Sequence, residues 1–133
     1  MPEPALRLAH LEKHYGTVVA VAGIDLHVEE GEFVTLLGPS GCGKTTTLGL
    51  IAGFFPPTKG EIWLKGKPVA NLPSFRRDIG VVFQDYALFP HMTAAENVAF
   101  GLRMRDVPST ERAKRVTDAL DLVKLAGLGD RRA

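Results

Sequence analysis

One short stretch of the chain has the residue types and the spacing that hold phosphate groups in proteins. It is an eight-residue run that satisfies the pattern G-x-x-x-x-G-K-[ST] and reads Gly38-Pro39-Ser40-Gly41-Cys42-Gly43-Lys44-Thr45. An apolar run at residues 33–37 precedes it, and a helical pattern begins at Lys44. The motif therefore lies between a predicted strand and a predicted helix, which is the context that a phosphate-binding loop requires.

Each position of this loop has a chemical reason. A helix start leaves backbone N–H groups without partners and carries partial positive charge, so a loop that turns these groups inward binds an anion. Gly41 and Gly43 allow the backbone to approach a phosphate, and Lys44 can place its ammonium between β- and γ-phosphates. The hydroxyl of Thr45 can ligate Mg²⁺, and that of Thr46 can donate to an α-phosphate. These features predict binding of a nucleoside triphosphate with Mg²⁺.

The loop and its cysteine each have an alternative interpretation. A glycine-rich turn between a strand and a helix can exist without any ligand. A helix N-terminus can also acidify a thiol, but nothing near Cys42 in the sequence supplies a base or a substrate, so we expect Cys42 to be an ordinary loop residue.

The segments around the loop predict a mixed α/β fold. Residues 33–37 are almost continuously apolar, which favours a strand at the centre of a parallel sheet, and residues 79–83 predict a further buried strand. Residues 24–28 and 61–65 alternate apolar and polar side chains, which predicts half-buried strands at an antiparallel edge.

Three helices are predicted. The first covers Lys44–Ala52, with Leu48, Ile51 and Ala52 facing the core and Gly53 as its C-terminal stop; Gly49 inside it costs about 1 kcal/mol relative to alanine, unless close packing requires it. A capping box formed by Thr93 and Glu96 opens a second helix at residues 93–103, and helical spacing predicts a third at residues 109–126.

Composition excludes several classes of protein. The 133 residues are 45% hydrophobic, which suits one domain or part of one. The net charge is +1, so no broad positive field recruits nucleic acid, and the pairs Arg76-Arg77 and Arg131-Arg132 are predicted to be solvated surface. The four His lie in different predicted elements and predict no zinc site, and the single Cys42 cannot close an internal disulfide. No apolar run approaches the roughly 18 residues of a membrane span, and we expect a cytosolic location.

Three further segments carry a resemblance to a known family. They are Tyr15-Gly16, Val82-Phe83-Gln84-Asp85-Tyr86-Ala87-Leu88-Phe89-Pro90-His91 and Glu96-Asn97-Val98-Ala99-Phe100-Gly101-Leu102. With the phosphate loop, they make the chain resemble the ATP-binding subunits of ABC transporters, most of all those of bacterial importers for polyamines, iron, sugars and similar solutes. The resemblance implies an α/β fold: the phosphate-loop core of an ABC ATPase domain with an antiparallel β edge at residues 1–85, and the start of a helical subdomain at residues 86–133.

The resemblance also assigns roles to individual residues. Tyr15 would stack on adenine; alternatively it is a core or surface tyrosine. Gln84 would approach Mg²⁺ and the attacking water and report the γ-phosphate to the membrane subunits; alternatively it is a polar residue at a strand end. The segment Tyr86, Ala87, Leu88, Phe89, Pro90 and His91 would form part of a groove for a cytoplasmic helix of a membrane subunit; alternatively it packs locally.

The chain is expected to be the N-terminal part of such a domain. Its last residues, 128–133, resemble the stretch before the family's signature loop, and neither that loop, the acidic strand nor the switch histidine is found. Asp85 does not replace the acidic strand, because four apolar residues do not precede it.

Three functions are compared. In the first, the complete protein binds ATP and Mg²⁺, dimerises with a second copy and drives solute import from the inner face of the cell membrane. In the second, the chain binds nucleotide without hydrolysing it, since the catalytic parts named above are missing. A phosphate-loop kinase or GTPase would share only Gly38 to Thr45. For the 133 residues alone we expect no hydrolysis.

Overall fold

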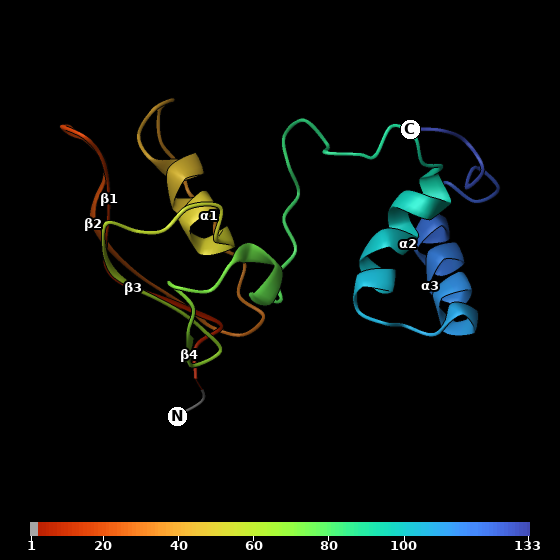
Figure 1. Cartoon of the computed structure of the whole chain (residues 1–133), viewed down its shortest axis with the longest axis horizontal. Helices are drawn as coiled ribbons and strands as arrows, with labels where there is room; N and C mark the ends of the chain where they lie inside the picture. The colour runs from red at the N-terminus through yellow and green to blue at the C-terminus, as the bar shows by residue number, and fades with distance from the viewer. Residues whose placement is uncertain (1–2) are drawn as a thin grey trace. The chain divides into compact units, whose positions relative to one another are not determined.

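The computed structural model describes residues 3–133, which fall into two compact units (Figure 1). The first ends at Val81 and the second runs from Val82 to Ala133. The first unit contains a four-stranded sheet and helix α1, and the second contains helices α2 and α3. The family resemblance predicts a boundary between residues 85 and 86.

The sheet is antiparallel, with strand order β2-β1-β3-β4. Its strands are β1 (Leu6–Tyr15), β2 (Val18–Val28), β3 (Lys59–Leu64) and β4 (Lys67–Pro68). The predicted strands at 24–28 and 61–65 are confirmed as parts of β2 and β3, and the predicted antiparallel edge is confirmed with them. The two strands do not pair with each other, because β1 lies between them.

Strand β1 was not predicted from the sequence, and a β-bulge explains why. The pairing register with β2 shifts between Leu8 and Leu11, and His10 has φ 48°, in the left-handed region. A bulge adds one residue to a strand, so the alternation of inward and outward side chains breaks there. Leu8 and Leu11 consequently both lie in the core although they are three residues apart.

The core of the first unit lies between the sheet and α1. Leu8 of β1 is opposite Leu26 and Ile62 in the register, so these side chains share one face of the sheet. Leu50 of α1 packs against that face and has no exposed surface. On the other face, the guanidinium of Arg7 lies 5.7 Å from the ring centroid of Trp63.

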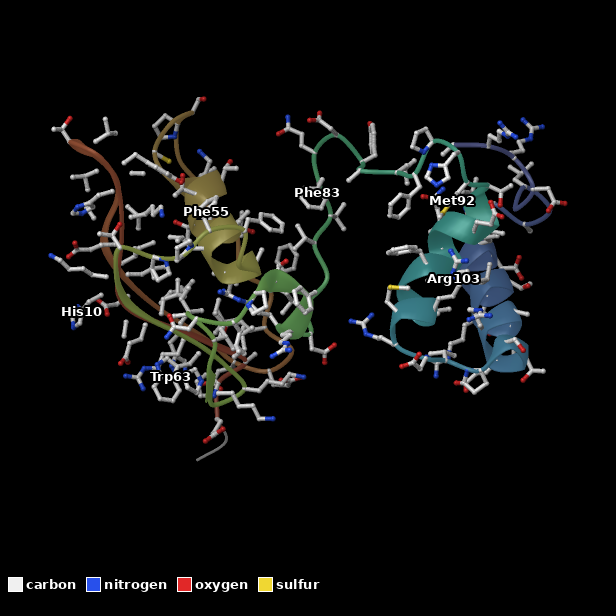
Figure 2. All side chains as sticks on the ribbon, in the orientation of Figure 1. His10, Phe55, Trp63, Phe83, Met92 and Arg103 are labelled. Atoms are coloured by element: carbon white, nitrogen blue, oxygen red, sulfur yellow. The ribbon has the colours of Figure 1, made fainter. Side chains whose placement is uncertain are left out.

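Helix α1 covers Lys44–Ala52, as predicted, and Gly53 ends it in the left-handed conformation with φ 81°. Burial of Ala52 is confirmed, whereas the prediction that Leu48 faces the core is wrong: Leu48 is 56% exposed, because Thr47 and Leu50 face the sheet instead. A Cβ atom at Gly49 would lie 2.6 Å from Cζ of Phe55, whose ring lies beside α1 (Figure 2). Close packing therefore explains the glycine inside this helix.

Both predicted central strands are wrong in this structure. Residues 33–37 and 79–83 form no strand, and Phe33, Leu37 and Val82 are 92%, 96% and 97% exposed. A strand inside a parallel sheet needs neighbours that supply its hydrogen bonds and helices that cover its faces. Neither run joins the sheet described within residues 3–133, and Phe33, Leu37 and Val82 stay open to solvent.

The second unit is helical, with α2 (Ala94–Met104) and α3 (Ser109–Leu122). The capping box is confirmed: the backbone N–H of Glu96 donates to Oγ1 of Thr93 at 3.2 Å, and the backbone N–H of Thr93 donates to Oε2 of Glu96 at 2.7 Å. Helix α3 ends at Leu122, four residues earlier than predicted, because the backbone turns into the left-handed region at Lys124.

Candidate functional site

The phosphate loop requires glycine at two positions for reasons that the structure shows. Gly43 caps the start of α1 with φ 97°, and a Cβ atom there would lie 2.6 Å from the carbonyl oxygen of Ala20 in β2. Gly41 has φ 79°, again in the left-handed region. The loop thus lies close to the backbone of β2, and its last residues lead directly into the first turn of α1.

Lys44 lies folded into this loop. Its ammonium donates to the carbonyl oxygens of Gly38 and Pro39, the latter at 2.7 Å, and lies 3.4 Å from Sγ of Cys42. The ammonium group that would contact a phosphate therefore already lies inside the loop, where it donates to carbonyl groups of the loop itself. Cys42 is a free, exposed thiol.

The remaining loop side chains differ in exposure. Ser40 and Thr45 are exposed, and Thr46 is half-buried. Thr47 is buried, and its hydroxyl donates to the carbonyl of Gly43 at 2.8 Å, which binds the first turn of α1 to the loop. An open cavity of about 430 Å³ is lined by residues of β2, the loop and α1, among them Val19, Val21, Cys42 and Thr47.

Tyr15 lies at the end of β1 in the same unit as the loop and is 50% exposed. Its ring makes an edge contact with Phe55 at 6.3 Å between centroids. The ammonium of Lys13 lies 5.1 Å from the centroid of Tyr15 and 5.4 Å from that of Phe55, and it donates to the carbonyl of Pro56 at 2.7 Å. Tyr15 is therefore a supported, half-exposed aromatic ring.

Arg77 is a residue that sequence reasoning missed. The pair Arg76-Arg77 was predicted to be solvated, which holds for Arg76 and is wrong for Arg77, because Arg77 is only 5% exposed. Its guanidinium donates to the carbonyl groups of Leu50 and Ile51 in α1, and burial lowers the pKa of this group from its ordinary value. No sequence pattern marks such a residue, since its acceptors are backbone groups.

Gln84 and the six residues predicted to contact a partner all belong to the second unit. Gln84 is exposed, in a turn that brings the N–H of Tyr86 to the carbonyl of Phe83. Tyr86 is 80% exposed and Leu88 is 54% exposed, as an interface would need. Ala87, Pro90 and His91 are exposed as well.

Phe89 differs from its neighbours in this segment. Its ring is half-buried, 4.6 Å between centroids from Phe100 of α2, and the side chain of Asn97 bonds both its N–H and its carbonyl oxygen, at 2.9 and 3.2 Å. Local packing therefore describes Phe89.

A family model for ABC transporters matches residues 21–133. The chain belongs to the ABC transporter family. Curated relatives of this ABC chain named "Spermidine/putrescine import ATP-binding protein PotA" are 54% identical in Thermobifida fusca and 51% identical in Legionella pneumophila. The alignments cover 96% and 98% of this chain but 34% and 36% of the relatives, so the chain spans about a third of their length.

Solved structures confirm the ABC ATPase fold. A dimeric ATP-binding cassette, MJ0796, captured in a post-hydrolysis state with ADP and Pi, matches this ABC chain with a TM-score of 0.85 and 31% identity. The match covers 96% of this chain and 61% of the cassette. Another dimeric structure of MJ0796, described as a bacterial ABC transporter cassette, gives the same values.

The structure of this ABC chain groups the expected site residues in two sets. Tyr15 and the loop from Gly38 to Thr46 belong to the first unit, and Gln84 with residues 86–91 belongs to the second. Within residues 3–133, no helix has the length and apolar character to cross a membrane. The same residues contain no group of three or more His, Cys, Asp or Glu that could hold a metal ion by itself.

Proposed function

We propose that the complete protein is the ATP-binding subunit of a solute importer, which hydrolyses ATP and dimerises with a second copy. The observation that carries this proposal is the loop at the start of α1, where glycine is sterically required beside β2 and Lys44 lies inside the ring of backbone groups. The likeness to a cassette with bound ADP and Pi favours hydrolysis over a module that only binds nucleotide. Polyamines are the first solutes to test, because the relatives are polyamine import proteins.

The loop residues fit a triphosphate. The amides at residues 41–46 bind phosphate oxygens, and the ammonium of Lys44 exchanges its carbonyl partners for the β- and γ-phosphates. Pro39, Ser40 and Cys42 shape the loop between its glycines. When bound, Mg²⁺ would offset the charge of the phosphate groups, and Thr45 would supply a hydroxyl ligand to it.

Two residues outside the loop have proposed roles as well, Tyr15 in the first unit and Gln84 in the second. The half-exposed ring of Tyr15 stacks on adenine, and Lys13 and Phe55 hold that ring in place. Gln84 would offer its side-chain amide to the metal ion and to the attacking water. Both roles come from the family resemblance.

The partner of residues 86–91 is a membrane subunit of the importer, and the protein lies on the inner face of the membrane. The exposed apolar side chains of Tyr86 and Leu88 supply the contact. Phe89 fixes this segment to α2 through its contact with Phe100. No nucleic acid is expected as a partner, because the net charge is +1.

Calorimetric titration with Mg-ATP tests the nucleotide site. Lys44→Ala should weaken binding by about 1.5–3 kcal/mol, roughly 10- to 150-fold, because a charge-assisted contact to phosphate is lost. Lys114→Ala is the control, since Lys114 is an exposed residue on α3. Equal affinity of the wild type and Lys44→Ala, or equal losses in both variants, would refute the proposed role of the loop.

A further inference from the structure

Arg77 is a buried cation whose four acceptors are all backbone carbonyl groups. Nη1 donates to the carbonyl oxygens of Leu50 at 2.7 Å and Ile51 at 3.0 Å, in the last turn of α1. Nε donates to Leu72 at 2.9 Å and Nη2 to Ala70 at 3.2 Å. One planar group thus joins the C-terminal end of α1 to the segment 70–77.

The contact is closely fitted on the helix side. A Cβ atom at Gly53, the residue that ends α1, would lie 2.5 Å from Nε of Arg77. The last carbonyl groups of a helix have no partners within it and carry partial negative charge, so a cation with several donors suits them. Lysine cannot replace this arrangement, because its ammonium has no planar fork of donors.

Helix α1 depends on anchors of this kind. It has nine residues, fewer than the roughly 12–15 that an isolated helix needs for stability in water. In the core cluster with the sheet it is represented by Leu50, with Ile51 packed against that cluster, and Leu48 is left exposed. Since the amides and the ammonium of the phosphate loop lie at its first turn, any tilt of the helix moves them.

We propose that Arg77 is a positioning residue for nucleotide binding: it fixes the far end of α1, and so keeps the loop amides and Lys44 in the geometry that holds phosphate. This inference rests on the proposed nucleotide site. Arg77 contacts the end of α1 opposite the loop, and it acts through this helix.

The test compares the affinity for Mg-ADP with the amount of folded protein. Arg77→Met keeps much of the side-chain volume and removes every donor, and Arg76→Met is the control, because Arg76 is exposed next to Phe75. Calorimetry gives the dissociation constant and the fraction of binding-competent molecules separately. We expect Arg77→Met to raise the dissociation constant about tenfold or more, and Arg76→Met to change it less than twofold.

A purely structural role gives another result. The competent fraction and the melting temperature of Arg77→Met would then fall while the dissociation constant of the folded molecules stays within twofold of the wild type, and the proposal would be overturned. If Arg77→Met does not fold, Arg77→Lys decides by the same criterion: a threefold or larger increase supports the positioning role, and a smaller one rejects it.

The same titrations distinguish this inference from the proposed function. If the wild type binds no Mg-ADP, or if the Lys44→Ala variant binds it as tightly as the wild type does, both the proposed nucleotide site and this inference are refuted. A wild type that binds and depends on Lys44, together with an unaffected Arg77→Met, removes the inference only.

Discussion

Two sets of apolar residues lie in opposite environments. Leu8, Leu50 and Ile62 are almost or fully buried between the sheet and α1, whereas the runs at residues 33–37 and 79–83 are largely open to solvent. Hydrophobicity does not separate the two sets, because both are rich in Val, Ile, Leu and Phe. They differ in whether their segment belongs to the described sheet or packs against it.

The buried set finds its partners nearby in the fold. β1 pairs with β2 across a short turn, and β3 follows α1 closely in the sequence. A central parallel strand needs neighbours on both sides, and these come from distant parts of a chain. The comparison teaches that an apolar run predicts burial only together with the segments that cover it.

The largest effect should come from Leu50→Ala, in contrast with Leu37→Ala. Leu50 has no exposed surface, so its truncation should lower the free energy of unfolding by about 2–5 kcal/mol, whereas Leu37 is 96% exposed and its truncation should cost less than about 0.5 kcal/mol. Urea denaturation of the two variants measures both values. Similar losses would show that residues 33–37 are covered in solution, and the contrast would not hold.

A smaller effect is expected at the glycines inside helices. At Gly49→Ala the new Cβ atom would meet the ring of Phe55 at 2.6 Å, so the variant should lose about 1–3 kcal/mol of stability. Gly101→Ala in α2 is the matched control, because nothing lies within 4 Å of a Cβ atom there, and it should gain about 0.5–1 kcal/mol. Thermal unfolding compares them, and a gain in both variants would mean that Phe55 moves aside easily.

Local signals explain what the sequence predicted correctly. Helix α1, its glycine stop and the capping box of α2 each depend on residues within a few positions of one another, and all are found. Strand β1 was missed because a bulge at His10 breaks its alternation, and Leu48 was misplaced because helical spacing alone does not say which face meets the sheet.

The candidate site divides in the same way. The pattern of the loop predicts a phosphate site, because glycine and lysine at fixed spacing express a local geometry, and the phosphate-binding role of these residues stays a prediction. The burial of Arg77 could not be predicted from the sequence, because its hydrogen-bond acceptors are carbonyl groups 26 and 27 residues away. Tyr15 and Gln84 were found only through the family resemblance, and their roles remain predictions.

The smallest expected effect concerns the capping box, where no distant partner is needed. The backbone N–H of Thr93 donates to the carboxylate of Glu96, and this bond, above all, lowers the pKa of Glu96 below its ordinary value of 4.5. A carboxyl group with a lowered pKa in the folded state stabilises it above the unfolded pKa, and this stabilisation is lost as the pH falls through the folded pKa. Helix α2 should therefore lose stability on acidification below about pH 4.5.

Glu96→Gln keeps a side chain that fits a capping box but does not titrate. Circular dichroism melts between pH 3 and 7 should show a steeper acid loss for the wild type than for Glu96→Gln. Parallel curves would mean that this exposed carboxylate contributes nothing measurable, and that the local signal places the helix start without stabilising it.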